Sequence, residues 1–320
     1  MNYFEGINNL IRKRQEEAVK IRRDYIKNIF AEQEEYRYDF EKMLGWPLVG
    51  YKPQETAEPL SEKLSEEDGY SVYRMQFEIL PGLKMTGLFF MANATEKKPM
   101  VMVQHGGWGT PEQICGIYGD TANYNDMLQR VIRHNVHAFA PQLLLWHDDF
   151  EVVFDRALID ARLKRVGSSI TAVEIFGIMR ILDYFERQPY VSDFGMVGMS
   201  YGGFYTMYTA AIDKRIKSAL SCSQFCTRDE WVGCDWTWFK SAEMFDDAEI
   251  ACLVYPRKLC IEVADTDGLF DWKFSRKSYE RIKEICADVG TDWIDFIVFN
   301  GEHEFNKDDM PIENLIKDLQ

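Results

Sequence analysis

A serine flanked by glycines is the strongest chemical signal in the sequence. Residues Gly198–Gly202 read Gly-Met-Ser-Tyr-Gly, with Ser200 at the centre. The apolar run Phe194–Gly198 is typical of a buried strand, and the pattern over Tyr201–Ile212 predicts a helix. A sharp strand-to-helix turn of this kind exposes the serine hydroxyl above a sheet, where it can attack a bound substrate. We therefore expect Ser200 to be the nucleophile of a nucleophile elbow.

A serine hydroxyl is a weak nucleophile unless a base removes its proton. The chain contains five histidines, and only His303 follows Ser200 in the sequence. In a strand–turn–helix site of this type the order along the chain is serine, acid, histidine. His303 also follows the last expected strand, Trp293–Phe299, at the strand end where ligands bind in α/β sheets. We expect His303 to be the general base and acid.

The acid that orients this histidine should follow the preceding strand, which is expected over Lys258–Val263. The loop after this strand contains Asp265 and Asp267, and Asp271 lies slightly farther along the chain. Asp267 lies deeper in the loop, beside Gly268, which permits a tight turn. Asp267 is therefore the favoured acid, with Asp265 and then Asp271 as open alternatives.

A tetrahedral intermediate needs two hydrogen-bond donors for its oxyanion. One should be the backbone N–H of Tyr201, directly after the nucleophile. The second should come from the loop after the expected strand Met100–Val103, where glycines let the backbone approach a ligand. Gly107 is the favoured donor and Trp108 the alternative, whereas His105 is expected to have a structural role.

Aromatic residues are concentrated in the irregular segment 222–257, where this type of site often carries a cap or pocket wall. Trp231, Trp236 and Trp238 lie in this segment. Together with Trp108 they are candidates for the substrate pocket. Ordinary packing of an insertion onto the core explains the three tryptophans of the segment equally well.

Helix and strand patterns alternate from about residue 100 onward, which predicts an α/β fold with a mostly parallel central sheet and helices on both faces. Residues 1–45 are expected to form a charged helical extension, and 46–320 the main domain with a cap insertion at 222–257. Residues 48–68 are expected to be a loop. Helices are expected over 3–44, 123–134, 170–188, 201–212, 273–289 and 308–319, and strands over 70–78, 84–91, 100–103, 136–140, 194–198, 216–221, 258–263 and 293–299.

Composition narrows the class of protein. The 320-residue chain has a formal net charge of −15, which disfavours nucleic acids and anionic membranes as partners. It shows no signal peptide and no apolar run near the roughly 20 residues of a membrane span. Its seven cysteines have irregular spacing, so we expect reduced thiols, a cytoplasmic location and no metal site. No cofactor is expected, and the helical extension suits a homo-oligomer.

Three further segments carry a family resemblance. Leu44–Leu48, Tyr255–Leu259 and Gly301–Phe305 resemble the lead-in, the entry to the acid-bearing strand and the histidine loop of the acetyl xylan esterase and dienelactone hydrolase branch of the α/β-hydrolases. The resemblance covers about residue 45 to the C-terminus. It implies the α/β-hydrolase fold and a triad of Ser200, Asp267 and His303, the set that the spacing also favours.

The function predicted from these residues is hydrolysis of a carboxylic ester, with acetylated sugars as candidate substrates, through a serine-bound acyl intermediate. Residues Ser200–Gly203 also resemble the elbow of prolyl oligopeptidases, so hydrolysis of small peptides or amides is an alternative. A chain of this length lacks room for the large domain that restricts access in those enzymes. A non-catalytic binding protein on a hydrolase scaffold is the third hypothesis.

Overall fold

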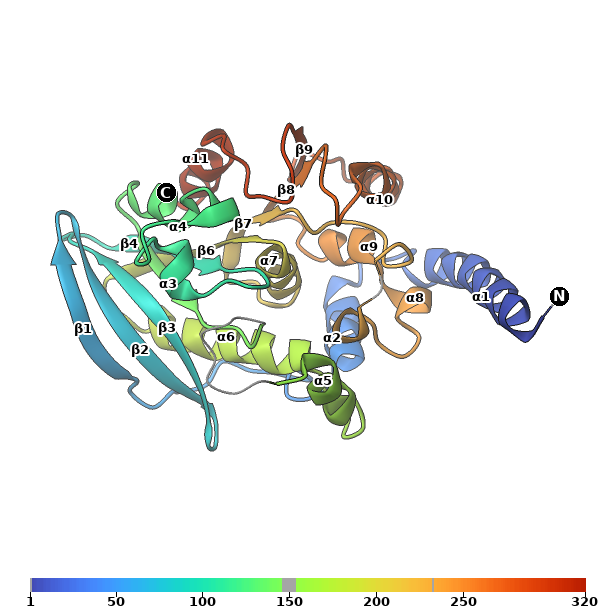
Figure 1. Cartoon of the computed structure of the whole chain (residues 1–320), viewed down its shortest axis with the longest axis horizontal. Coiled ribbons are helices and arrows are strands. Elements are labelled where there is room, and N and C mark those ends of the chain that lie inside the picture. The colour runs from blue at the N-terminus through green and yellow to red at the C-terminus, as the bar shows by residue number, and fades with distance from the viewer. Residues whose placement is uncertain (1, 146–153, 232) are drawn as a thin grey trace.

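The computed structural model describes residues 2–145, 154–231 and 233–320 (Figure 1). A nine-stranded sheet forms its centre, with the strands β1 Leu60–Glu67, β2 Tyr70–Leu80, β3 Leu83–Ala92, β4 Lys98–Gln104, β5 His137–Pro141, β6 Val191–Met199, β7 Ile216–Cys222, β8 Lys258–Ala264 and β9 Ile294–Phe299. Their order is β1-β2-β3-β5-β4-β6-β7-β8-β9. β1, β2, β3 and β5 pair antiparallel, and all pairs from β5 to β9 are parallel. This sheet confirms the predicted α/β class.

Helices cover both faces of the sheet. They are α1 Tyr3–Tyr25, α2 Gln33–Leu44, α3 Pro111–Ile114, α4 Met127–Ile132, α5 Arg156–Lys164, α6 Ile170–Glu186, α7 Tyr201–Ile212, α8 Ser241–Met244, α9 Asp247–Cys252, α10 Trp272–Ile285 and α11 Met310–Lys317, with 3₁₀ turns η1 Ala122–Tyr124 and η2 Cys234–Trp236. Successive side chains of β4 alternate between two apolar clusters, Met100 facing one and Val101 the other. α2, α6, α7, α9 and α10 contribute to the first cluster, and α3, α4 and α11 to the second.

The N-terminal extension is two helices rather than one continuous run. α2 lies in the core, where Phe40 is fully buried and its ring packs edge-on against Tyr208 of α7. Gly45 ends α2 with a φ of 103°, and a side chain there would collide with the Gly167 backbone. α1 projects away from the body toward the N-terminus (Figure 1). Its second half is anchored to the body, in part through Arg22, which donates to the Ala242 carbonyl at 2.6 Å.

Two further expectations about local structure were wrong. The segment expected as a loop over 48–68 contains β1, an edge strand whose side chains are exposed on both faces. Because neither face is buried, β1 lacks the alternating pattern by which strands are recognised. The helix expected over 123–134 is shortened to α4, because Asn125 and Asp126 adopt left-handed φ angles of 47° and 56°.

Candidate active site

Ser200 lies on the turn between β6 and α7, as the sequence predicted. Its φ of 57° and ψ of −124° are strained for a residue with a side chain. A side chain at Gly198 would collide with the backbone of Gly202, and one at Gly202 with the backbone of Gln104. The Ser200 N–H donates to the Cys222 carbonyl of β7 at 2.9 Å. Close packing of the turn against β4 and β7 therefore holds this strained conformation.

His303 and Asp267 are hydrogen-bonded to each other. Nδ1 of His303 lies 2.8 Å from Oδ2 of Asp267. Oδ1 of Asp267 accepts bonds from the Leu269 and Phe270 N–H groups at 2.7 and 3.1 Å. Because this carboxylate can only accept, Nδ1 carries the hydrogen and Nε2 keeps its lone pair. The Asp267 side chain is 1% exposed and that of His303 21%, so the imidazole alone reaches solvent.

The two alternative acids have other partners. Asp265 accepts hydrogen bonds from the Gly301 N–H at 3.1 Å and the Asn300 amide at 3.3 Å, which ties the β8 loop to the β9 loop. Asp271 caps α10 by accepting from the Lys273 N–H at 2.9 Å. Of the three aspartates considered from the sequence, Asp267 is therefore the one bonded to His303.

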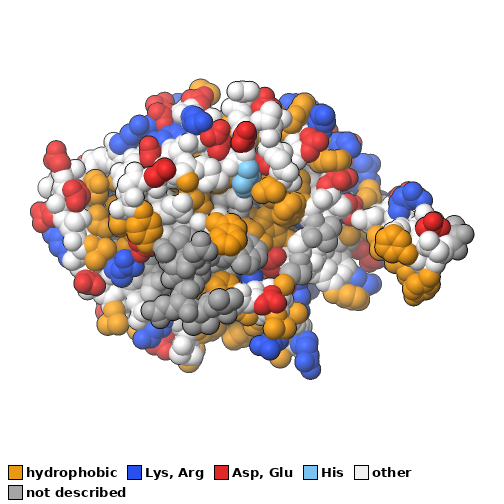
Figure 2. Space-filling model, in the orientation of Figure 1, with side chains coloured by type: hydrophobic (Ala, Val, Ile, Leu, Met, Phe, Trp, Pro, Cys, Tyr) orange, Lys and Arg blue, Asp and Glu red, His pale blue; other side chains and the backbone are white. Residues whose placement is uncertain are grey.

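Ser200 and His303 line the same pocket, which has a volume of about 530 Å³. Figure 2 shows hydrophobic side chains gathered around a histidine near the middle of the displayed face. Among the described lining residues, His303 is the only histidine, and none is Asp, Glu, Lys or Arg. The lining residues are Gly107, Trp108, Gln113, Ala122, Asn123, Tyr124, Met199, Ser200, Tyr201, Trp231, Trp236, Leu269, Phe270 and His303.

Three of the four tryptophans expected in the pocket line it. Trp108 is 62% exposed at the rim, with a φ of 61°, whereas Trp236 is 1% exposed. Trp231 is the third. Trp238 requires a correction, because it does not line this pocket. Its ring packs near Tyr208, and the Lys164 ammonium lies 5.7 Å from the ring centroid, which places it in a separate groove beside α2 and α5.

The loop at residues 105–107, expected to supply the second oxyanion donor, is fixed by hydrogen bonds to Leu143 and Tyr124. His105 is fully buried, and its Nε2 accepts from the Leu143 N–H at 3.0 Å. Its Nδ1 therefore donates to the Gly106 carbonyl at 2.9 Å. The Gly106 N–H donates to the Tyr124 hydroxyl at 2.9 Å. Within the described part of the chain the Gly107 N–H has no acceptor, so it can donate to a ligand in the pocket.

Residues around His303 that the sequence did not single out complete the site. The Phe270 ring stacks on the imidazole at a centroid distance of 5.8 Å and on Trp236 at 6.0 Å. The Asn123 side chain donates to the His303 carbonyl at 2.9 Å. Phe270 lies three residues after Asp267, so its position in the acid loop was an available signal. Asn123 carried none, since it lay within an expected helix.

Another buried carboxyl lies beneath the histidine loop. Glu262 of β8 is 1% exposed, and its Oε1 accepts from the Asn306 side chain at 2.6 Å. Its Oε2 has no partner among the described residues. Burial raises the pKa of Glu262 to about 7. Glu262 does not line the pocket, so we expect its ionisation to change the stability of the fold beneath the site.

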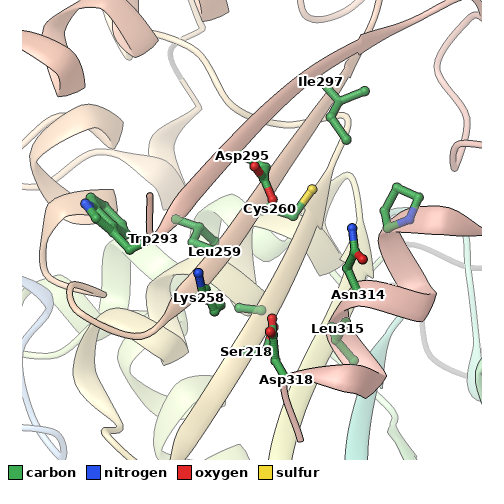
Figure 3. Close-up of a pocket in the computed structure, with 12 residues that line it drawn as sticks. Ser218, Lys258, Leu259, Cys260, Trp293, Asp295, Ile297, Asn314, Leu315 and Asp318 are labelled. Carbon is green, nitrogen blue, oxygen red and sulfur yellow. The ribbon is translucent and has the colours of Figure 1, made fainter. Parts of the chain in front are cut away.

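A second cavity lies at the amino-terminal ends of β7 and β8, against α11 (Figure 3). Polar side chains of Ser218, Lys258 and Asp295 are among those that line it. Its volume of about 30 Å³ suits ordered water rather than a substrate. Ser200 follows the opposite, carboxyl end of its strand, so this cavity is separate from the candidate site.

The described ranges can be compared with the patterns of metal sites and membrane-spanning helices. Within residues 2–145, 154–231 and 233–320, no three His, Cys, Asp or Glu side chains are grouped as metal ligands. Nor does any helix in these ranges combine the length and apolar character needed to cross a membrane. Cys222 and Cys226 are free, buried thiols.

Solved structures share this architecture at low sequence identity. A glucuronoyl esterase from Solibacter usitatus matches with a TM-score of 0.65 and 13% identity, covering 92% of each chain. Acetyl xylan esterase 1 from Thermoanaerobacterium matches with a TM-score of 0.60 and 13% identity, covering 90% of this chain and 93% of that one. A Bacteroides fragilis protein assigned provisionally as an acetyl xylan esterase matches with a TM-score of 0.66 and 17% identity, covering 83% and 74%.

These similarities confirm the α/β-hydrolase fold. No protein-family model matches the chain, and no curated protein matches its sequence. At such identities the likeness extends to the fold alone, so the reaction has to be argued from the site itself.

Proposed function

We propose that this protein is a serine hydrolase that cleaves carboxylic esters. The observation that carries the proposal is the His303–Asp267 hydrogen bond beside a pocket that is also lined by Ser200 on its strained turn. This combination supplies a nucleophile, a base with its lone pair on Nε2, and a buried acid that orients the base. The pocket is large enough for a small-molecule ester.

The proposed reaction has two halves. Ser200 Oγ attacks the ester carbonyl carbon while His303 Nε2 takes its proton, giving a tetrahedral oxyanion that the Tyr201 and Gly107 N–H groups stabilise. The C–O bond to the alcohol then breaks, and His303 returns the proton to the leaving oxygen. Water, deprotonated by His303, attacks the acyl-serine, and the carboxylic acid leaves as Ser200 regains its proton. Asp267 stabilises the imidazolium in both halves.

The similar structures are esterases whose names refer to acetyl xylan and glucuronoyl substrates. They support an ester attached to a sugar as the candidate substrate class. Trp108 at the rim offers an exposed aromatic face against which a sugar ring could stack.

The direct test is Ser200→Ala with 4-nitrophenyl acetate as substrate. We expect kcat to fall by roughly 10⁴-fold, because the substitution removes the nucleophile and leaves the fold intact. A fluorophosphonate probe should label the wild-type chain and not the variant. Ser61→Ala on the exposed edge strand β1 is the matched control and should retain full activity. Near-normal turnover by folded Ser200→Ala, or faster cleavage of an aminoacyl anilide than of the ester, would refute the proposal.

A further inference from the structure

A cluster of buried charges lies behind the aromatic wall of the pocket. The Arg156 side chain of α5 is fully buried and donates from Nε to Asp235 Oδ2 at 2.7 Å and from Nη2 to Glu174 Oε2 at 3.0 Å. Nη1 donates to the Leu144 carbonyl at 2.5 Å. Burial alone would lower the pKa of Arg156, but the adjacent carboxylates, Glu174 above all, raise it well above its usual value. The cluster therefore holds one guanidinium and two carboxylates.

Asp235 connects this cluster to the pocket. The Tyr201 hydroxyl donates to the Asp235 carboxylate, whose oxygens lie at 3.1 and 3.3 Å. Asp235 directly precedes Trp236, and the Tyr201 and Trp236 rings meet edge-on at 4.6 Å. Both rings line the pocket. A ligand in the pocket is therefore separated by one layer of aromatic side chains from the Asp235 carboxylate and from the Arg156 guanidinium, which lies 5.4 Å from the Tyr201 ring centroid.

A second cation near this wall is also paired with a carboxylate, and its side chain is 11% exposed. Arg228 lies over the Trp236 ring at 4.5 Å and donates from Nε to Asp247 at 2.9 Å. Asp267 adds a further carboxylate beside His303. Among the groups named so far, two guanidinium groups accompany four carboxylates, those of Glu174, Asp235, Asp247 and Asp267, while the neighbouring Asp246 is paired with Arg22 at 3.4 Å.

This arrangement has an electrostatic consequence. None of the described lining residues is Lys or Arg, so none of them offers a permanently charged cationic partner to a bound carboxylate. Aromatic walls exclude water, and charges interact more strongly across such walls than across solvent. An excess of buried negative charge would therefore disfavour a bound anion. Dissolved salt would screen this repulsion only weakly, because the charges are buried.

We propose that this excess charge makes the pocket reject esters that carry a carboxylate, so that the substrate is an ester without negative charge, and that Asp235 is a specificity-determining residue. This inference rests on the proposed ester hydrolysis and adds the class of ester that is accepted. The carboxylate product of hydrolysis would be disfavoured in the pocket by the same charge, which would promote its release.

The test compares 4-acetoxyphenylacetamide with 4-acetoxyphenylacetate, which differ by one neutral amide in place of one carboxylate. A methylene insulates that group from the leaving phenol, so intrinsic reactivity is closely matched. We expect wild-type kcat/KM at pH 8 to favour the amide by about tenfold or more, in 0.15 M and in 1 M NaCl. Asp235→Asn and Glu174→Gln each remove one negative charge and should each reduce this preference at least threefold.

Asp193→Asn is the matched control, because it removes one charge near the amino-terminal end of β6, far along the strand from Ser200. It should leave the preference unchanged. Equal kcat/KM for the two esters in the wild type, or an unchanged preference in folded Asp235→Asn and Glu174→Gln, would overturn the inference.

Affinity measurements without turnover test the charge preference independently of the proposed reaction. Dissociation constants of both esters for Ser200→Ala, read from tryptophan fluorescence, should show the same order of preference without turnover. Equal affinities would overturn the inference even if hydrolysis depends on Ser200. Hydrolysis that persists in Ser200→Ala would overturn the proposed function while leaving the binding preference intact.

Discussion

Two buried aspartates each hold one polar side chain of the pocket, and their partners differ. Asp267 accepts from His303 and from two backbone N–H groups, none of which carries a full charge when His303 is neutral. Asp235 accepts from the Tyr201 hydroxyl and is paired with the Arg156 guanidinium at 2.7 Å. The first carboxylate can therefore respond to a proton arriving on its neighbour, whereas the second already has a cationic partner, which it shares with Glu174.

In the proposed reaction, this difference separates Asp267, which acts on the base, from Asp235, which shapes the pocket wall. Backbone donors orient the Asp267 carboxylate without cancelling its charge, so that charge can stabilise an imidazolium. The guanidinium fixes Asp235 in place, and Asp235 in turn fixes the Tyr201 hydroxyl at the pocket wall. Substitutions at the two positions should therefore change different quantities.

The largest expected effect is on turnover in Asp267→Asn. An Asn side chain keeps the shape of the acid but favours the wrong imidazole tautomer, a change that lowers kcat by about 10⁴-fold in serine proteases with the same triad. We expect a loss of that order in kcat for 4-nitrophenyl acetate, with an unchanged thermal midpoint. Asp235→Asn should lose far less activity toward this uncharged ester. Equal losses at the two positions would show that the comparison is mistaken.

Removing the cation of the second site should instead lower stability. Arg156→Met leaves Glu174 and Asp235 buried without their cation, a change that typically costs about 3–5 kcal/mol of unfolding free energy. Urea denaturation at pH 8 measures this loss. Arg162→Met on the exposed face of the same helix is the control and should stay within about 0.5 kcal/mol of wild type. A stability loss no greater than that of the control would contradict a structural role for Arg156.

Glu262 extends the comparison to a buried carboxyl that has neither a cation nor an imidazole partner. Its pKa is raised to about 7 by burial, so the folded chain retains a proton that the unfolded chain releases near pH 4.5. Stability from this group is therefore greatest at low pH and falls as pH rises from about 4.5 to about 7, by on the order of 3 kcal/mol.

Glu262→Gln should remove this pH dependence. The free energy of unfolding of the variant minus that of the wild type should therefore be larger at pH 8 than at pH 5. Urea denaturation at both pH values measures this difference. Glu313→Gln, on the exposed face of α11, should follow the wild-type pH dependence. A Glu262→Gln profile parallel to wild type would show that Glu262 ionises at its ordinary pKa in the folded chain.

The smallest effect is expected at Asp265, which lies two residues from Asp267 but bonds only to the histidine loop. Asp265→Asn keeps one acceptor for the Gly301 N–H and should lose no more than about 1–2 kcal/mol of stability. Substantial esterase activity should remain. A kcat as low as that of Asp267→Asn, in a folded variant, would move the acid's role to Asp265.

Much of the fold and the core of the site were predictable because the signals are local. The strand–turn–helix around Ser200 is a continuous segment, and the structure places α7 over the expected residues Tyr201–Ile212. The order of serine, acid and histidine is also a property of the chain itself. The edge strand β1 escaped prediction for the converse reason, since exposure on both faces removes the periodic pattern.

What the sequence by itself determined was the α/β-hydrolase fold, the strand-to-helix turn at Ser200 and a short set of candidate partners for that serine. Cytoplasmic location and homo-oligomer formation stay predictions. The tertiary structure decided which aspartate bonds His303, because Asp265 and Asp267 share one loop and only the folded loop directs one to the Gly301 N–H and the other to the imidazole. It also revealed Arg156, Glu174 and Asp235, which come from three separate elements. Long-range ion pairs have no periodicity or fixed spacing in a sequence, so only the packing of α5, α6 and η2 could bring these charges together.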